Sequence, residues 1–249
     1  MKRLTLGYLL LLLCISSFAQ IRAVKSRATS YKSSKSVGTS SSDSYYASDD
    51  DDGSFFGELI GQAIFGGIYR GFSSAQHYQL NNAWEEDWRI SAEFKLSGGV
   101  NFGTVNYFDQ QMIRGNYGLF STQVRRMNVN DVSGGFTTID WQILQLNLIN
   151  RSSVRWVLGG GISHEVEVDQ THFEYATELY ISVNKMFMPF LTYRKSGDGY
   201  PREEFTANLE IRPFRDQINE FSFSAGYLYQ RLYGIDFHFP SLGVGFYLK

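Results

Sequence analysis

His172 is the histidine whose surroundings offer the best prospect of acid–base chemistry. It lies across an expected external hairpin from two carboxylates, Glu165 and Glu167. A histidine within hydrogen-bond reach of a carboxylate is a common general base or acid. Ser163 and His164 are adjacent, so in a strand their side chains point to opposite faces and cannot form a dyad. Scattered histidines at strand ends are the simpler interpretation.

A second set of residues with chemical potential consists of charged side chains that alternate with apolar ones. Because alternate side chains of a strand share a face, these charges are expected together on the face opposite the apolar one. Buried charges are costly unless they are paired. The pattern therefore predicts a structural ion-pair network inside a closed barrel, with a narrow polar pore or a small-ligand cavity as the alternative. The predicted lumen network is Glu93, Lys95, Arg155, Glu174, Glu178, Glu204, Glu210 and Arg212.

Long alternating segments must position these residues. Residues 90–102 alternate for 13 positions, whereas soluble strands have about 5–6 residues and a membrane-crossing strand needs roughly 9–11. The same alternation recurs at residues 154–163, 173–183, 204–212 and 221–230, and more weakly at 116–127, 134–148 and 187–195. Three consecutive glycines, residues 159–161, interrupt one strand, and we interpret them as a bend or a site of close packing.

The C-terminal residues 241–249 supply one more strand, whose Leu242, Val244, Phe246 and Leu248 form a wholly apolar face. This end resembles the β-signal read by the outer-membrane barrel assembly machinery, from which Lys249 departs by adding a charge. A terminal strand is protected when it pairs with the first strand of a closed barrel, because no edge then remains. The residues that match the signal are Ser241, Gly243, Phe246 and Leu248.

The number of strands follows from these segments. Nine strands can be counted from Trp88, and single-chain outer-membrane barrels have an even number. Eight or ten strands are therefore expected, with residues 60–72 as a candidate for the tenth. Tight connections are predicted at 150–153, 184–186 and 215–219, and looser ones at 128–135, 195–202 and 232–240.

The N-terminal third of the chain begins with features of an exported protein. Residues 1–19 have the cationic start, apolar stretch and small residues of a cleavable signal peptide, with Gln20 as the mature N-terminus. Residues 20–53 are rich in serine and end in an acidic run, which predicts a disordered linker. Residues 54–87 are expected to form a membrane-associated helix, a plug or a first strand. Cys14, the single cysteine, would leave with the signal, so no disulfide is expected.

Composition and motifs argue against several classes of function. The net charge is −2, and 24 glycines and 36 Phe and Tyr residues (20 and 16) accompany only 4 prolines. No motif for phosphate, zinc or a nucleophilic serine is present. We therefore expect no cofactor, no metal and no nucleic-acid partner. The aromatic residues expected to include members of an interfacial girdle are Trp84, Trp88, Trp141, Trp156, Tyr229 and Tyr233.

Together these features look like the small outer-membrane β-barrel families of diderm bacteria, a resemblance that covers residues 88–249. It implies an all-β, antiparallel, up-and-down transmembrane barrel of 8 to 10 strands, preceded by the linker and inserted by the barrel assembly machinery. The expected protein is not an enzyme but has a structural, adhesive or narrow-pore role in the outer membrane. Its expected partners are outer-membrane lipid and a protein that contacts the linker or the external loops. The alternatives are a lipid-modifying hydrolase or acyltransferase that uses His172 with an acidic partner, and a soluble periplasmic barrel that binds an apolar ligand.

Overall fold

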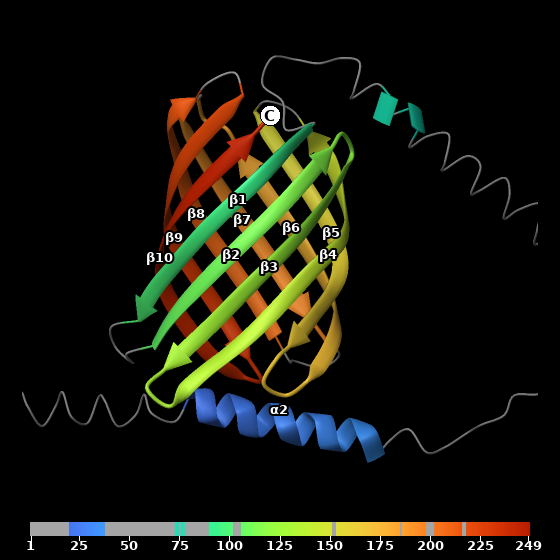
Figure 1. Cartoon of the computed structure of the whole chain (residues 1–249), viewed down its shortest axis with the longest axis vertical. Helices are drawn as coiled ribbons and strands as arrows, with labels where there is room; N and C mark the ends of the chain where they lie inside the picture. The colour runs from blue at the N-terminus through green and yellow to red at the C-terminus, as the bar shows by residue number, and fades with distance from the viewer. Residues whose placement is uncertain are drawn as a thin grey trace, which may run out of the picture.

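The chain forms a closed antiparallel β-barrel of ten strands, as seen in a computed structural model (Figure 1). The structure describes residues 20–37, 73–74, 76–77, 90–101, 106–150, 153–184, 186–197, 202–215 and 218–249. Each strand pairs with its neighbours in sequence, and the last strand pairs with the first. The strands are β1 (Ile90–Asn101), β2 (Asn106–Tyr117), β3 (Phe120–Asp131), β4 (Gly134–Asn150), β5 (Val154–Glu165), β6 (Gln170–Ile181), β7 (Phe187–Ser196), β8 (Arg202–Arg215), β9 (Asn219–Leu232) and β10 (Ile235–Leu248).

The C-terminal strand closes the barrel, as its sequence predicts. β10 pairs with β1 from Ala92↔Leu248 to Gly99↔Ser241 and with β9 along its whole length. The apolar face of this strand, which includes Phe246 and Leu248, points away from the barrel. From Ser241 to Leu248 the terminal strand is therefore paired on both edges.

The tenth strand is β2, which the alternation pattern does not reveal. Both of its faces mix polar and apolar residues: Tyr107, Asp109 and Gln111 point outward, while Phe108 and Met112 point inward. A strand that is mixed on both faces carries no clear two-residue period. Ten strands are thus complete without residues 60–72, which lie outside the described residues.

Two of the three connections that were predicted to be loose are in fact tight. β3 and β4 are joined by residues 132–133, and β9 and β10 by residues 233–234. Tyr233 and Gly234 both have positive φ, 49° and 76°, as a two-residue hairpin turn requires. The polar residues around these turns belong to strands that extend beyond the predicted limits.

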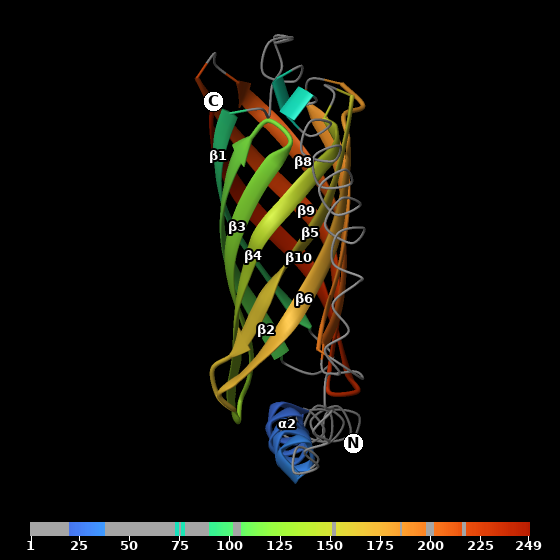
Figure 2. The ribbon, with the colours of Figure 1, turned by 90° about the vertical axis from the view of Figure 1, so that its right-hand side faces the viewer.

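Residues 20–37 form the helix α2 (Gln20–Val37), so the prediction of a disordered linker was wrong for this stretch. α2 lies across the end of the barrel opposite the C-terminus (Figure 2). Ile21, Val24 and Ala28 are buried there. They recur at intervals of three and four residues, a short apolar stripe that serine-rich surroundings conceal in the sequence.

The remaining N-terminal predictions fall largely outside the described residues. These are the signal peptide at 1–19, the rest of the linker at 38–53 and nearly all of 54–87. Gln76, one of the few described residues there, lies at the end of the barrel that holds the C-terminus, where its side chain donates to the Tyr117 carbonyl at 3.0 Å. Among the described residues, no helix is long and apolar enough to cross a membrane.

Candidate functional site

The interior of the barrel is filled by charged side chains. All eight residues of the predicted lumen network point inward from strands β1, β5, β6 and β8. Seven of them are buried, and the side chain of Lys95 is 14% exposed. Because these side chains are buried, each charge needs a partner of opposite sign inside the barrel.

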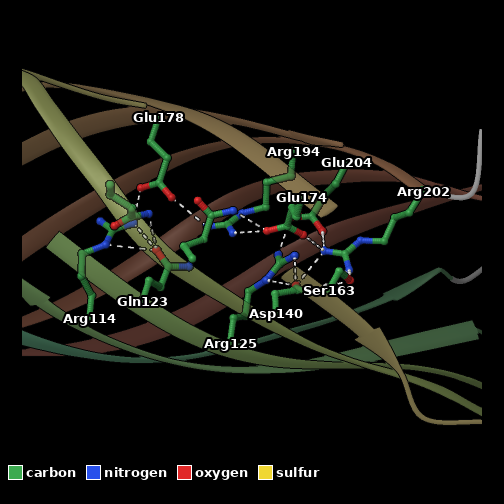
Figure 3. Close-up of polar contacts among 12 residues, drawn as sticks. Arg114, Gln123, Arg125, Asp140, Ser163, Glu174, Glu178, Arg194, Arg202 and Glu204 are labelled. Carbon is green, nitrogen blue, oxygen red and sulfur yellow. Dashed lines mark hydrogen bonds and ion pairs between the residues drawn. The ribbon is translucent and has the colours of Figure 1, made fainter. Parts of the chain in front are cut away.

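Asp140 on β4 is the centre of this network (Figure 3). Its two oxygens accept hydrogen bonds from Arg125 Nη2 at 2.6 Å and from Arg202 Nη1 at 2.7 Å. Ser163 also donates to Asp140, at 2.7 Å. The carboxylate thus joins the guanidinium group of Arg125 on the neighbouring strand β3 to that of Arg202 on β8.

From this centre the ion pairs continue along the lumen. Arg202 reaches Glu174 at 3.2 Å, and Arg194 bridges Glu174 at 3.2 Å and Glu178 at 2.7 Å. Glu178 in turn pairs with Arg114. Alternating charges of β2, β6, β7 and β8 therefore form a continuous chain of contacts.

A second group of pairs fills the end near the C-terminus. Arg212 lies 2.8 Å from Glu210 and 3.0 Å from Glu220, and Lys95 lies 3.0 Å from Glu210. Tyr247 donates its hydroxyl to Glu210 at 2.6 Å. The ammonium of Lys95 also lies 5.1 Å from the centre of the Tyr247 ring, close enough for a cation–π interaction.

The charges inside the barrel nearly cancel. Each cation of the network has a carboxylate within 4.0 Å, so little net charge remains to select a passing ion. The paired cations are Lys95, Arg114, Arg125, Arg155, Arg194, Arg202, Arg212 and Lys249, and the carboxylates are Glu93, Asp140, Glu174, Glu178, Glu204, Glu210 and Glu220.

Little space remains between these side chains. A cavity of about 60 Å³ is lined by polar residues such as Thr192, Asn208 and Ser241 and by the arginines Arg114, Arg125 and Arg194. A water occupies roughly 30 Å³ in the liquid, so this volume suits a few waters at most. This cavity is therefore too small to form a passage.

Sequence reasoning missed half of this network. Arg114 and Arg125 lie on β2 and β3, where the alternation is broken. Arg202 was placed in a loop but is the first residue of β8. Asp140 sits within a strand whose pairing with β5 shifts register. A signal was present at Arg125, because it shares its strand face with the buried Gln123 and Met127.

The candidate acid–base residues are only partly brought together. His172 Nε2 lies 3.9 Å from Glu165 Oε2, and both side chains are buried. Glu165 also accepts a hydrogen bond of 2.5 Å from the Tyr233 hydroxyl. Glu167 instead accepts from the backbone nitrogen of Thr137 on the exposed side. The pair thus lies beside Tyr233, within the barrel end that α2 covers.

Of the residues predicted for the aromatic girdle, three of those that the structure describes lie on the outer face and one lies inside the barrel. Trp141 and Trp156 point outward and are 47% and 39% exposed. Tyr229 is on the outer face, where it donates to Asp236 at 2.8 Å. Tyr233 does not belong to a girdle, because it turns inward and is buried. Its position in the tight turn between β9 and β10 directs the ring under α2.

The β-signal residues occupy both faces of β10. Ser241 and Gly243 face the lumen, and Phe246 and Leu248 face outward. A Cβ on Gly243 would lie 2.8 Å from the Leu96 carbonyl oxygen of β1. Glycine at this position therefore permits the close contact between the last and first strands.

Metal chemistry has no visible support in the described ranges, where no three His, Cys, Asp or Glu side chains are arranged to hold an ion. Neither a known protein family nor a curated protein matches the sequence. Among solved structures, the chain is similar to the NanC porin in a rhombohedral crystal form, with a TM-score of 0.36 and 10% identity, over 63% of this chain and 99% of that one. It is also similar to the KdgM porin, with a TM-score of 0.31 and 8% identity, over 64% and 99% of the two chains. At such identities no residue role can be carried from either porin to this chain.

Proposed function

We propose that this protein is an outer-membrane β-barrel whose own side chains close its lumen, and that its role is structural rather than catalytic. The observation that carries the proposal is the distribution of polarity, which is reversed relative to a water-soluble barrel. Charges fill the inside, while large apolar side chains cover the outside.

The apolar belt involves every strand. Each of the ten strands carries at least one large hydrophobic side chain that is 38% or more exposed, such as Phe94 on β1, Val124 on β3, Leu191 on β7 and Leu209 on β8. A soluble monomer rarely exposes an apolar patch larger than a few hundred Å². Surrounding lipid removes this penalty, since hydrocarbon is the preferred environment of these side chains.

On β7 to β10 the belt gives way to a polar rim at the end covered by α2. There the outer face carries the ion pairs Lys195–Glu203, at 3.2 Å, and Arg231–Asp236, at 2.7 Å. Each of these four residues is the second or second-last residue of its strand. Such a rim is where a bilayer's hydrocarbon core would give way to headgroups and water.

The filled lumen favours a closed barrel over the narrow-pore alternative. The chain of ion pairs crosses the barrel and α2 covers one mouth. The assignment to the outer membrane in particular is supported by the signal-like N-terminus and the β-signal-like C-terminus. We accordingly propose outer-membrane lipid as the lasting partner and the barrel assembly machinery as a transient one.

Membrane fractionation followed by gel mobility with and without boiling tests the proposal. We expect the protein in the outer-membrane fraction, with an unboiled band that migrates differently from the boiled one. Recovery as a soluble periplasmic protein without detergent would refute the membrane assignment. In planar bilayers we expect no stable conductance, and reproducible conductance steps would favour the narrow pore instead.

A substitution on the belt separates a lipid-facing surface from a water-facing one. Leu158, in the middle of β5, is 39% exposed on the outer face. In lipid, Leu158→Arg should cost about 2–4 kcal/mol of stability or reduce insertion. In a soluble barrel the same exposed substitution would be nearly neutral, within about 0.5 kcal/mol. Urea unfolding of the purified variant measures the difference.

A further inference from the structure

The end of the lumen under α2 differs in chemistry from the rest of the lumen. Here many inward side chains are apolar and form one cluster with the buried face of the helix, while buried polar groups such as Asp131, Glu165 and His172 lie beside that cluster. The barrel strands contribute eight residues of the cluster, among them Phe136, Leu232 and Phe239, and the turns add Val168 and Tyr233. We call this end of the lumen the mouth. An apolar surface of this kind is unfavourable in contact with water, which indicates that the mouth is normally covered.

α2 matches this surface through one narrow stripe. Ile21, Val24 and Ala28 are at most 1% exposed, and Tyr31 packs against the same cluster. The ring of Tyr31 lies 6.0 Å from that of Tyr233. A stripe at helical spacing that enters an apolar groove is the usual mode of helix recognition.

Polar contacts at the edge of the mouth fix the helix in position. The backbone nitrogen of Ile21 donates to the buried carboxylate of Asp131 at 3.0 Å. Arg27 donates to the Tyr233 carbonyl at 3.0 Å, and Lys32 donates to the carbonyl of Val168 at 2.8 Å. At these three contacts the mouth presents acceptors, and the helix supplies donors and positive charge.

We propose that this mouth is a binding site for a basic amphipathic helix, and that α2 is its reversible occupant from the same chain. α2 has five basic residues and no acidic one, which suits the hydrogen-bond acceptors at the edge of the mouth. The site is thus a groove for a helix with apolar residues at positions 1, 4, 8 and 11 of the stripe, defined by Ile21, Val24, Ala28 and Tyr31.

Reversibility follows from the composition of α2. It contains six Ser and Thr residues and has no acidic residue in its first turn, so it is a weak helix in isolation. Docking therefore supplies most of the helix stability. The 52 residues between Val37 and Ile90 tether α2 to the mouth and give it a high effective concentration.

The test uses the full-length protein in detergent and a fluorescent peptide of residues 20–37. In the barrel chain, Val24→Asp with Ala28→Asp places charges in the buried stripe and should release α2. The matched control is Ser26→Asp with Ser30→Asp, which places the same charges on the exposed face of the same helix. Fluorescence anisotropy measures peptide binding, and the mobility of the unboiled band confirms that each barrel is folded.

We expect the peptide to bind the stripe variant at least about tenfold more tightly than it binds the wild type or the control, because α2 still occupies the mouth in those two chains. A peptide that carries Val24→Asp and Ala28→Asp should not bind. Equal binding to all three chains would place the peptide elsewhere and overturn the proposal, as would absence of binding to the folded stripe variant. If the double substitution prevents folding, Ala28→Asp alone is tested in the same way. None of these outcomes depends on where the protein fractionates.

Discussion

Arg125 and Arg126 are neighbours in β3 that experience opposite environments. Arg125 is 2% exposed and contacts Asp140 at 2.6 Å and Glu204 at 2.5 Å. Arg126 lies on the outer face and is exposed. The burial of Arg125 is tolerable because two carboxylates compensate its charge, and their own burial depends on it in turn.

At the residue scale, Arg125→Met should destabilise the barrel by about 3–5 kcal/mol, because Asp140 and Glu204 lose a shared cation in a buried site. Arg126→Met should not destabilise the barrel, because an apolar side chain suits the outer face. Urea-unfolding midpoints of both variants in detergent provide the measurement. Equal effects of the two substitutions would show that the inner ion pairs contribute nothing specific to stability.

At the scale of elements, β4 and β5 show how an irregular strand requires glycine in its neighbour. Their pairing shifts register between Trp141 and Leu144. A Cβ on Gly161 would lie 1.9 Å from the Trp141 carbonyl oxygen, which is backbone and cannot give way. A Cβ on Gly160, on the other face, would only touch the end of the Phe173 ring at 3.5 Å. The close packing predicted for residues 159–161 is thus present at Gly161.

Gly161→Ala should therefore force β4 and β5 apart and cost at least about 2 kcal/mol, in the range of an overpacked core. Gly160→Ala should change stability by less than about 0.5 kcal/mol. The fraction of protein that gives the folded, unboiled band after refolding reports on both variants. A normal yield of folded Gly161→Ala would mean that the two strands can separate without cost.

At the scale of the whole molecule, the two ends of the barrel are distinct surfaces. α2 lies at one end, and the C-terminus and the start of β1 lie at the other (Figures 1 and 2). In the proposed membrane setting the two ends face different compartments. Ser30 on α2 and Asn219 at the start of β9 are exposed residues that report on them separately.

Single-cysteine variants can assign these ends, since the only native cysteine is Cys14. The resemblance to outer-membrane barrels places the C-terminal end on the periplasmic side. On intact cells, a membrane-impermeant maleimide should then label Ser30→Cys, while Asn219→Cys should react only after the outer membrane is permeabilised. The converse pattern would reverse the orientation of the barrel. Equal labelling of both variants before permeabilisation would argue against a continuous barrier between the two ends.

The sequence by itself determined the barrel class and which residues share a face. Alternation is a local property of strands, so the inward position of Glu93 or Glu210 and the outward position of Phe94 or Leu209 follow from residue order alone. The closure of β10 on β1 was also predictable, because an apolar terminal strand needs a partner on each side.

Tertiary structure alone decided which charges meet and what covers the mouth. Arg202 and Asp140 are 62 residues apart, and Ile21 and Asp131 are 110 apart, so no local pattern relates either pair. The helix α2 could not be predicted for the same reason. Its apolar stripe is short, so the helix is stabilised mainly by packing against the barrel. Strand faces are set by neighbours in sequence, whereas ion pairs and docked helices are set by neighbours in space.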